Sequence, residues 1–407
     1  SRAVRRFTLL ILLLALPLAA AADEGHGGID VIDSSGPLDA SALEFMVDSI
    51  EAAALSGQEL AVLQINSRAV LDEEGYSRLR RVVANPPLPV AIWVGPAPAR
   101  AYGGAAVLVS EAAVAAIAPG SEIGLTQPEV LGVGPSPAER QEILSAEETG
   151  LELQPSIRQY LQALDGRTFP TAQGPVTVST LEAFGDGITV KEVTFRQPGL
   201  GARFFRLAVT PEAAFLFLMV GLTILTFEFY ALGPGVAAGV AAISLILGGW
   251  GAVTLPVRWW ALALALVGWA LLTVGYQKGG VFALSLIGAV TLQVAGTFYI
   301  DGAGQLDPRW WLVLPTVLAV LFFYLIAMPT VQRARLSTHS IGRRHLVGQA
   351  GIALVDFAPD GLVEVAGARW RGTAHREAGI HSGDEVIVIG VDGMYLEVEP
   401  AASGRET

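Results

Sequence analysis

The sequence predicts a chain of three parts: an α/β domain with a parallel sheet, an α-helical membrane bundle of five spans, and a small all-β barrel. Three observations support this prediction. Short apolar runs alternate with helical patterns over residues 23–206, as in domains with a parallel sheet. Long apolar stretches fill residues 211–332. Residues 343–402 alternate apolar and polar side chains between glycines, as the strands of a barrel do.

The composition narrows the class of protein. Of the 407 residues, 52% are hydrophobic and 16% are charged, which favours a membrane protein over an ordinary soluble one. The chain has no cysteine, which excludes disulfides, thiolate chemistry and cysteine-bound metals. The formal net charge is −12, whereas binding to nucleic acid usually needs a basic domain. We therefore expect no nucleic-acid partner.

Residues 1–22 have the order of a secretory signal peptide. Three arginines come first, the apolar run Phe7–Leu18 follows, and the small residues Ala19–Ala22 come last. We expect cleavage near Ala22, with an uncleaved anchor helix as the alternative. Either form would deliver the next domain across the membrane.

Residues 23–206 form the predicted exported domain. Three apolar runs, Ile29–Asp33, Leu60–Ile65 and Pro89–Val94, are expected to be buried parallel strands. Two amphipathic patterns between them, Asp39–Gly57 and Glu73–Asn85, predict helices. Beyond these, we expect helical pieces around Ser136–Leu164 and strands near Val176–Val178 and Ile188–Val193.

A glycine-rich turn lies within Pro98–Val107, between an apolar strand and an apolar helix predicted over Ala106–Gly120. A turn of this kind often presents a nucleophile, because the helix start offers free backbone N–H groups. This one ends in Tyr102-Gly103-Gly104, with no Ser, Thr or Cys from Pro96 to Val109. The sequence thus predicts the position of a nucleophile without the nucleophile.

Residues 211–332 form the predicted membrane region. Tryptophans lie at the edges of its apolar spans, as in aromatic belts, and an arginine cluster follows the last span. By the positive-inside rule we expect a multi-pass protein of the cell membrane, with an extracytoplasmic α/β domain and a cytoplasmic C-terminal domain. The five expected spans are Ala213–Leu232, Gly235–Val257, Trp259–Tyr276, Val281–Ile300 and Trp310–Thr330.

Three groups of motifs resemble one known family. They are the strand, turn and helix of Ala91–Gly124, the hairpin TFEFYALGPGVAAGVAAISLILGGW (Thr226–Trp250), and the barrel stretches Gly348–Gly372 and Gly383–Pro400. Together they resemble the long form of the NfeD family, whose outer domain is similar to the Clp-type serine proteases. The resemblance implies a crotonase-like, Clp protease-like α/β fold, an OB-type NfeD domain at residues 343–402, and a stomatin-like (SPFH) membrane partner.

The sequence departs from this family where its chemistry is expected. Active members place a nucleophilic Ser where this chain has Gly103. Their Asp-Thr-Pro-Gly-Gly oxyanion loop matches Asn66–Val70, so that Ala69 and Val70 replace the two glycines. Their general base is a Lys, and no lysine precedes Lys191 here. We expect a catalytically degenerate domain and assign it no catalytic residue.

None of the remaining residues is a suitable base to activate a hydroxyl. His26 lies in the flexible start GHGG, and Lys191 lies in an alternating stretch close to the membrane, so we expect both to be solvated or interfacial. Carboxylates such as Glu122 rarely activate a hydroxyl alone. Ser110 and Ser121 flank the helix after the turn, and neither is expected to act as a nucleophile.

Four turn residues are candidates for a residual cleft: Arg100, Tyr102, Gly103 and Gly104. Tyr102 has an ordinary pKa near 10, so we expect it to be protonated and packed into the vacated pocket. Arg100 cannot act as a base; it either binds a carboxylate or phosphate or is a solvated loop residue. The two glycines either allow a positive φ or a close helix–strand approach at the turn, or they belong to a residual peptide-binding cleft.

The other candidate sites are weaker. Glu228 lies in a span near Pro234, where we favour a structural role at the turn over a pathway role. The cluster Arg369–Arg371 permits an oligonucleotide hypothesis, but the barrel is otherwise acidic and a protein-interaction module is favoured. We expect no metal and no cofactor, because the histidines lack partner sets: His339 with His345, and His375 with His381.

We interpret the chain as a membrane scaffold. Its partners would be a stomatin-like SPFH protein, the lipid bilayer and polypeptide segments that it holds without cutting. Assembly into a homo-oligomer is a further possibility. The alternative is an active membrane-bound serine protease of the Clp class that uses unrecognised residues. A transporter or channel would need several ionisable residues in the spans, where Glu228 stands nearly alone.

Overall fold

The computed structural model describes residues 27–134, 141–184, 187–231, 235–330, 344–375 and 378–401. The chain divides into two compact units, one ending at Met328 and the other beginning at Pro329. The predicted signal peptide and His26 lie outside the described residues.

The first unit begins with an α/β domain built on a parallel sheet, as predicted. Six strands lie in the order β13-β1-β2-β3-β5-β8, and every neighbouring pair is parallel. The three predicted strands are confirmed as β1, β2 and β3. The strands are β1 (Ile29–Ser35), β2 (Leu60–Asn66), β3 (Val90–Val94), β5 (Ala115–Ile117), β8 (Glu152–Leu153) and β13 (Val193–Arg196).

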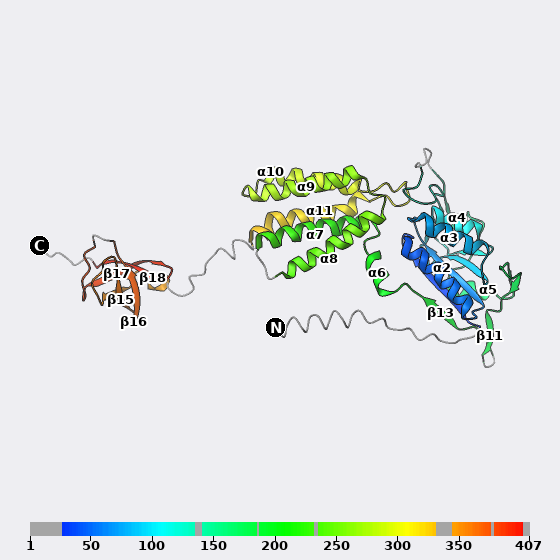
Figure 1. Cartoon of the computed structure of the whole chain (residues 1–407), viewed down its shortest axis with the longest axis horizontal. Helices are drawn as coiled ribbons and strands as arrows, with labels where there is room; N and C mark the ends of the chain where they lie inside the picture. Colours follow the sequence, from blue (N-terminus) through cyan, green and yellow to red (C-terminus); the bar gives the residue numbers. More distant parts are fainter. Residues whose placement is uncertain are drawn as a thin grey trace. The chain divides into compact units, whose positions relative to one another are not determined.

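Both predicted helices of this domain are present, and each begins at a capping carboxylate. Asp39 accepts a hydrogen bond from the Ala42 N–H (3.0 Å) before α2 (Ala40–Leu55), and Asp72 one from the Gly75 N–H (2.7 Å) before α3 (Glu73–Ala84). The two helices lie side by side over one face of the sheet (Figure 1).

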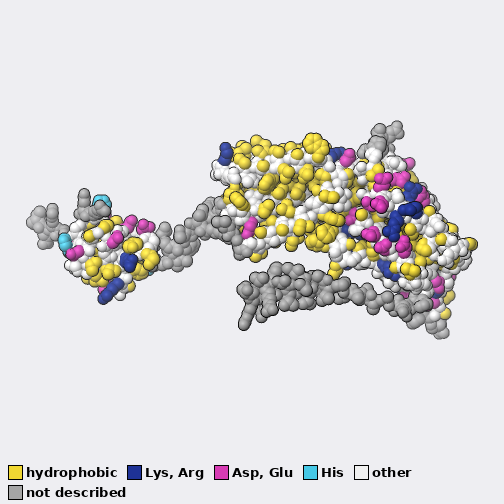
Figure 2. Space-filling view, in the orientation of Figure 1, with side chains coloured by type: hydrophobic (Ala, Val, Ile, Leu, Met, Phe, Trp, Pro, Cys, Tyr) yellow, Lys and Arg dark blue, Asp and Glu magenta, His cyan; other side chains and the backbone are white. Residues whose placement is uncertain are grey.

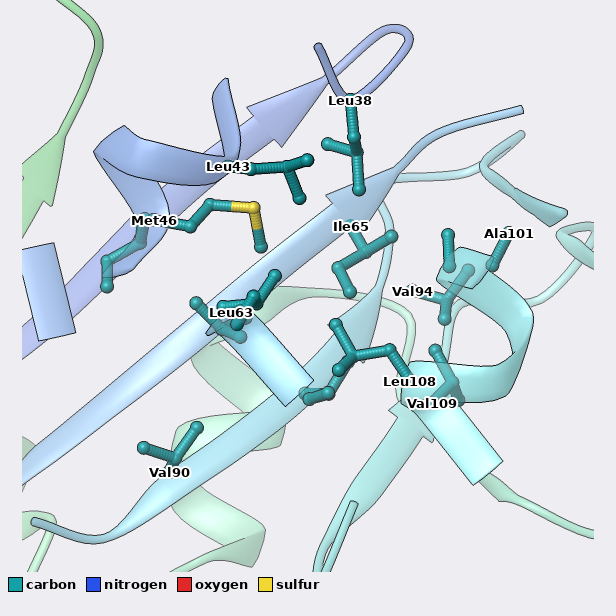
Figure 3. Packing of buried hydrophobic residues seen from close by; sticks show 14 of the residues in the cluster. Leu38, Leu43, Met46, Leu63, Ile65, Val90, Val94, Ala101, Leu108 and Val109 are labelled. Atoms are coloured by element: carbon teal, nitrogen blue, oxygen red, sulfur yellow. The ribbon is translucent and has the colours of Figure 1, made fainter. Parts of the chain in front are cut away.

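Helices on both faces bury the sheet. Figure 3 shows Leu43 and Met46 of α2 over Leu63 and Ile65 of β2, within one buried cluster. On the opposite face lies α5 (Ile157–Ala163), whose fully buried Tyr160 donates a hydrogen bond to the Ile92 carbonyl (3.0 Å). Because alternate residues of each strand face opposite helices, the strands read as continuous apolar runs.

The predicted helix over Ala106–Gly120 is wrong in its second half. Helix α4 (Gly104–Glu111) has eight residues, and Ala115–Ile117 forms β5 beside β3. A short apolar run is ambiguous between a buried helix and a buried strand, and here pairing with β3 decided the outcome.

Beyond Gly132, where the sequence pattern is less regular, the chain forms more strands than predicted. In the described part of Ser136–Leu164, only α5 is helical, and the predicted strands around residues 176–193 are present. A second sheet has the order β4-β6-β7. Two further sheets pair β9 with β10 and β11 with β12. The strands of these three smaller sheets are β4 (Arg100–Tyr102), β6 (Glu122–Gly124), β7 (Ile143–Ser145), β9 (Thr168–Phe169), β10 (Val176–Thr177), β11 (Leu181–Phe184) and β12 (Gly187–Val190).

The rest of the first unit is helical and apolar. Among the described residues, four helical segments are long and apolar enough to cross a membrane: Pro211–Tyr230, Val236–Thr254, Trp259–Gln277 and Trp310–Thr330. Phe282–Thr297 (α10) has 16 residues, about 24 Å at the helical rise. Figure 2 shows hydrophobic side chains covering these helices on the face in view. The helices are α6 (Leu200–Arg206), α7 (Pro211–Ala231), α8 (Val236–Thr254), α9 (Trp259–Gln277), α10 (Phe282–Thr297) and α11 (Trp310–Phe322), with a π-helical turn at Phe323–Ala327.

Glycines let two pairs of these helices approach closely. A Cβ on Gly248 of α8 would lie 2.7 Å from the Leu218 nitrogen of α7. A Cβ on Gly268 of α9 would lie 3.0 Å from the Gly288 carbonyl oxygen of α10. Gly249, by contrast, has open space where its Cβ would be.

The second unit contains the predicted barrel. Five strands close in the order β14-β15-β16-β18-β17, with β16 and β18 parallel and the other pairs antiparallel. Alternate residues such as Val386, Val388, Leu396 and Val398 fill its interior. The strands are β14 (Ala350–Ala353), β15 (Asp360–Val365), β16 (Ala368–Thr373), β17 (Glu385–Asp392) and β18 (Tyr395–Pro400).

Candidate functional site

The turn between β4 and α4 has the backbone of a nucleophile elbow. Gly103 adopts φ +60° and ψ −134°, a conformation that L-residues rarely enter and that strained strand-to-helix turns use to present a side chain. The Tyr102 N–H donates to the Ser67 carbonyl (3.0 Å), so the turn lies beside the loop that follows β2. The structure therefore places Gly103 close to the loop that holds Ala69 and Val70.

A glutamine from the membrane region fills the space in front of Gly103. Gln305 lies in the connection between α10 and α11 and is fully buried. A Cβ on Gly103 would lie 2.6 Å from its Oε1. The Gln305 Nε2 donates to the carbonyls of Leu125 and Pro128, both at 2.9 Å. A side chain at position 103 and the present position of Gln305 therefore exclude each other.

The backbone donors at the start of α4 are already used. The Gly103 N–H donates to the Leu125 carbonyl (2.9 Å), and the Gly104 N–H donates to the Glu129 carbonyl (2.7 Å). An oxyanion hole needs such donors free to meet developing charge. Here the segment from Leu125 to Glu129 takes them instead.

The loop after β2 packs against the helical region of the first unit. Ala69 and Leu131 belong to the same buried cluster as Leu255, Ile300 and Leu306. The carbonyl of Val70 accepts from the Leu131 N–H (2.8 Å), so this loop is tied to the segment that crosses the turn. Apolar packing thus occupies the edge where the resemblance placed an oxyanion loop.

Arg100 and Tyr102 share one carboxylate. The Arg100 Nε lies 3.1 Å from Glu122 Oε2, and the Tyr102 hydroxyl donates to the same oxygen. Burial and this hydrogen bond raise the pKa of Tyr102 to about 12, and the Tyr102 hydroxyl is the main cause that lowers the pKa of Glu122. Tyr102 is buried as predicted, but Gln305, which the sequence analysis missed, is the side chain against Gly103.

The candidate base Lys191 lies at the far edge of the sheet. Its Nζ pairs with Glu59 Oε1 at 2.7 Å, just before the paired starts of β13 and β1. Gly103 lies beyond the other ends of the strands, and the seven residues of β2 separate these edges by roughly 20 Å. Lys191 therefore cannot take a proton at the turn.

The two candidate serines make hydrogen bonds of a structural kind. The Ser110 hydroxyl donates to the Val107 carbonyl of its own helix (2.7 Å). The buried Ser121 hydroxyl accepts from the Ala99 N–H (3.0 Å). Neither contact supplies a base.

Glu228 lies in the last turn of α7. Its Oε1 accepts from the Gly235 N–H (3.0 Å), the structural contact that the sequence favoured. It also lines a mostly apolar cavity of about 500 Å³ with Thr226, Trp269 and Thr273.

Within the described residues, no group of three or more His, Cys, Asp or Glu side chains could hold a metal ion.

Comparison with known families matches two parts of the chain. Residues 212–328 match the NfeD integral membrane domain. Residues 343–400 match the NfeD-like C-terminal, partner-binding domain. These two domains and their order fit the long form of the NfeD family.

The membrane-bound protease PH1510 of Pyrococcus horikoshii is 24% identical over 215 residues, which are 51% of this chain. The match spans 48% of that relative, about half of its length. Among solved structures, the P. horikoshii 1510-N membrane protease, specific for a stomatin homolog, is 15% identical with a TM-score of 0.36, and the match covers 45% of this chain and 98% of that one.

The C-terminal domain of the P. horikoshii stomatin operon partner protein 1510-C is 25% identical with a TM-score of 0.15. That match covers 16% of this chain and 98% of the solved one.

Proposed function

We propose that this chain, with NfeD membrane and C-terminal domains in the long-form order, is a membrane scaffold with a catalytically degenerate protease-like domain. One observation carries the proposal: Gln305 fills the position where a nucleophile would project from Gly103. The edge that would bind and cut a peptide instead joins the α/β domain to the membrane helices. We propose a crotonase-like, Clp protease-like topology for this domain.

The scaffold is a multi-pass membrane protein in this proposal, with the α/β domain extracytoplasmic and the barrel cytoplasmic. We propose five spans, with α10 as the fifth. Two contacts support this: Val257, before α9, pairs with Ile300, after α10, and Gly268 of α9 lies against Gly288 of α10. The two helices therefore run antiparallel over nearly the same depth.

The barrel would bind a stomatin-like SPFH partner. Its match to a partner-binding domain supports this, together with the separate compact unit that it forms. Polypeptide segments would reach the remnant of the cleft at Arg100, Tyr102 and the two glycines only after Gln305 leaves it. The scaffold could act as a homo-oligomer.

Two experiments test the proposal. The full-length chain in detergent should not react with a fluorophosphonate probe for activated serines and should not cleave apolar peptides. Labelling that disappears in Ser110→Ala or Ser121→Ala would instead establish a protease. The full-length chain should also co-purify with a stomatin-like protein from native membranes, whereas a chain ending at Thr330 should not. Equal recovery with both chains would contradict a role for the barrel.

A further inference from the structure

A small cavity with separated charges lies where the α/β domain meets the first membrane helix. Its volume is about 200 Å³. One wall comes from the loop after β2 and from the connection between β1 and α2, and the other from the start of α7 and the connection between α10 and α11. The lining residues are Gly36, Pro37, Asn66, Arg68, Thr210, Pro211, Glu212, Leu306 and Asp307.

Arg68 supplies the positive wall. The residue is half-buried, its Nε is inaccessible, and that atom has no hydrogen-bond partner. Across the part of the chain that the structure describes, its guanidinium forms no ion pair. Burial is the main cause that lowers the pKa of Arg68; the charges of Arg100 and Arg309 lower it further, while Tyr102 and Glu212 oppose the shift. An unpaired, partly desolvated cation is costly, and an anion in the cavity would offset that cost.

Two carboxylates supply the negative wall. Glu212 Oε1 accepts from the Arg309 N–H (3.0 Å), and Asp307 Oδ2 accepts from the Gly304 N–H (3.2 Å). Both therefore hold their positions without help from a cationic side chain. The cavity thus presents a cation on one side and two anions on the other, which suits a small zwitterion better than a simple anion.

The cavity lies at the depth of lipid headgroups. Pro211 begins α7, and Trp310 with Trp311 begins α11 just beyond Asp307. Both tryptophans are exposed, as is Trp259 at the start of α9. Exposed tryptophans at helix ends mark the membrane–water interface.

We propose that this cavity binds the headgroup of a phosphatidylethanolamine lipid. The phosphate lies at Arg68 and Asn66, and the primary ammonium lies at Glu212 and Asp307. A guanidinium matches phosphate oxygens, and a primary ammonium donates hydrogen bonds to carboxylates that a quaternary ammonium cannot. Arg68 occupies the position at which the resembled family has a proline, so this guanidinium belongs to the present chain. Lipid binding here does not depend on the proposed scaffold function.

Native mass spectrometry of the full-length chain tests the proposal. The chain is titrated in detergent with phosphatidylethanolamine, phosphatidylcholine and phosphatidylglycerol. We expect phosphatidylethanolamine to bind about tenfold more tightly than either other lipid, and Arg68→Met to lose that preference. Arg203→Met is the matched control, because Arg203 is an exposed arginine of α6 close to the start of α7. Glu212→Gln should weaken phosphatidylethanolamine but not phosphatidylglycerol.

Thermal unfolding separates binding from folding. Phosphatidylethanolamine should raise the unfolding temperature of the wild-type chain and of Arg203→Met but not that of Arg68→Met. Without lipid, Arg68→Met should unfold no earlier than the wild type. Equal retention of the three lipids, or equal retention by the two arginine variants, would overturn the proposal. Glycerophosphoethanolamine, the soluble headgroup, should bind far more weakly; tight binding of it without the lipid would make a free phosphodiester the ligand and refute the lipid.

Discussion

Replacing Gly103 by alanine tests whether Gln305 fills the nucleophile position. Two costs should add. An alanine at φ +60° and ψ −134° is strained by about 1–3 kcal/mol. Its Cβ would also lie 2.6 Å from Gln305 Oε1, so the buried amide must turn away. Loss of its hydrogen bond to Pro128 then leaves that buried carbonyl unpaired, at about 1–3 kcal/mol, whereas the Leu125 carbonyl keeps the Gly103 N–H.

The expected loss in the free energy of unfolding is therefore about 2–6 kcal/mol, or roughly 4–12 °C in unfolding temperature. Differential scanning calorimetry of the full-length chain in detergent measures it. Gly120→Ala is the matched control, because Gly120 has φ +74° and nothing within 4 Å of its Cβ position. It should show the strain of a positive φ alone.

A double-mutant cycle separates the two costs of Gly103→Ala. In a Gln305→Ala background no amide opposes the new Cβ, so Gly103→Ala should cost only the strain of about 1–3 kcal/mol. The coupling between positions 103 and 305 would then be about 1–3 kcal/mol. An equal cost of Gly103→Ala in both backgrounds would refute the reasoning.

Three further predictions concern other contacts. Arg196→Met should cost about 3–5 kcal/mol in denaturant unfolding, because it leaves the fully buried Asp30 carboxylate without its ion pair; adding Asp30→Asn should recover most of the loss. The lowered pKa of Glu122 contributes stability above its ordinary value of 4.5 that is lost as the pH falls through the lowered value. Tyr102→Phe should therefore make the unfolding temperature fall less steeply below pH 4.5 than in the wild type. Equal pH dependence of the two unfolding temperatures would contradict this role of the Tyr102 hydroxyl. Gly268→Leu should separate α9 from α10 and lower the unfolding temperature, whereas Gly249→Leu, at an open position, should change it little.

The sequence predicted those features that depend on local pattern. The strands β1 to β3 read as apolar runs, and α2 and α3 as amphipathic patterns bounded by Asp39 and Asp72. The barrel strands alternate with period two, and in the described residues four of the five predicted spans coincide with apolar helices long enough to cross a membrane, whereas α10 is shorter. The error at Ala115–Ile117 shows the limit of this reasoning, because a short apolar run fits a buried helix or a buried strand and pairing with β3 decides between them.

The candidate site could be predicted only in part. The assignment of Gly103 to a nucleophile position, and of Ala69 and Val70 to an oxyanion loop, comes from the resemblance of local motifs and stays a prediction. The contact of Gln305 with Leu125 spans 180 positions along the chain, and a glutamine in a polar connection carries no local signal for burial. The cavity at Arg68 is built from four separate segments, so neither its shape nor its charges could be read from one stretch.

The contact between Gln305 and the elbow has a practical consequence for anyone who expresses the α/β domain by itself. A fragment ended before α7 would lack Gln305, and the Pro128 carbonyl would lose its hydrogen bond from this glutamine. Gln305 covers Gly103 in the present chain, whereas Gly103 would be uncovered in such a fragment. Peptide binding measured on it would report on an artefact of truncation, and only the intact chain in detergent or lipid can answer what this domain recognises.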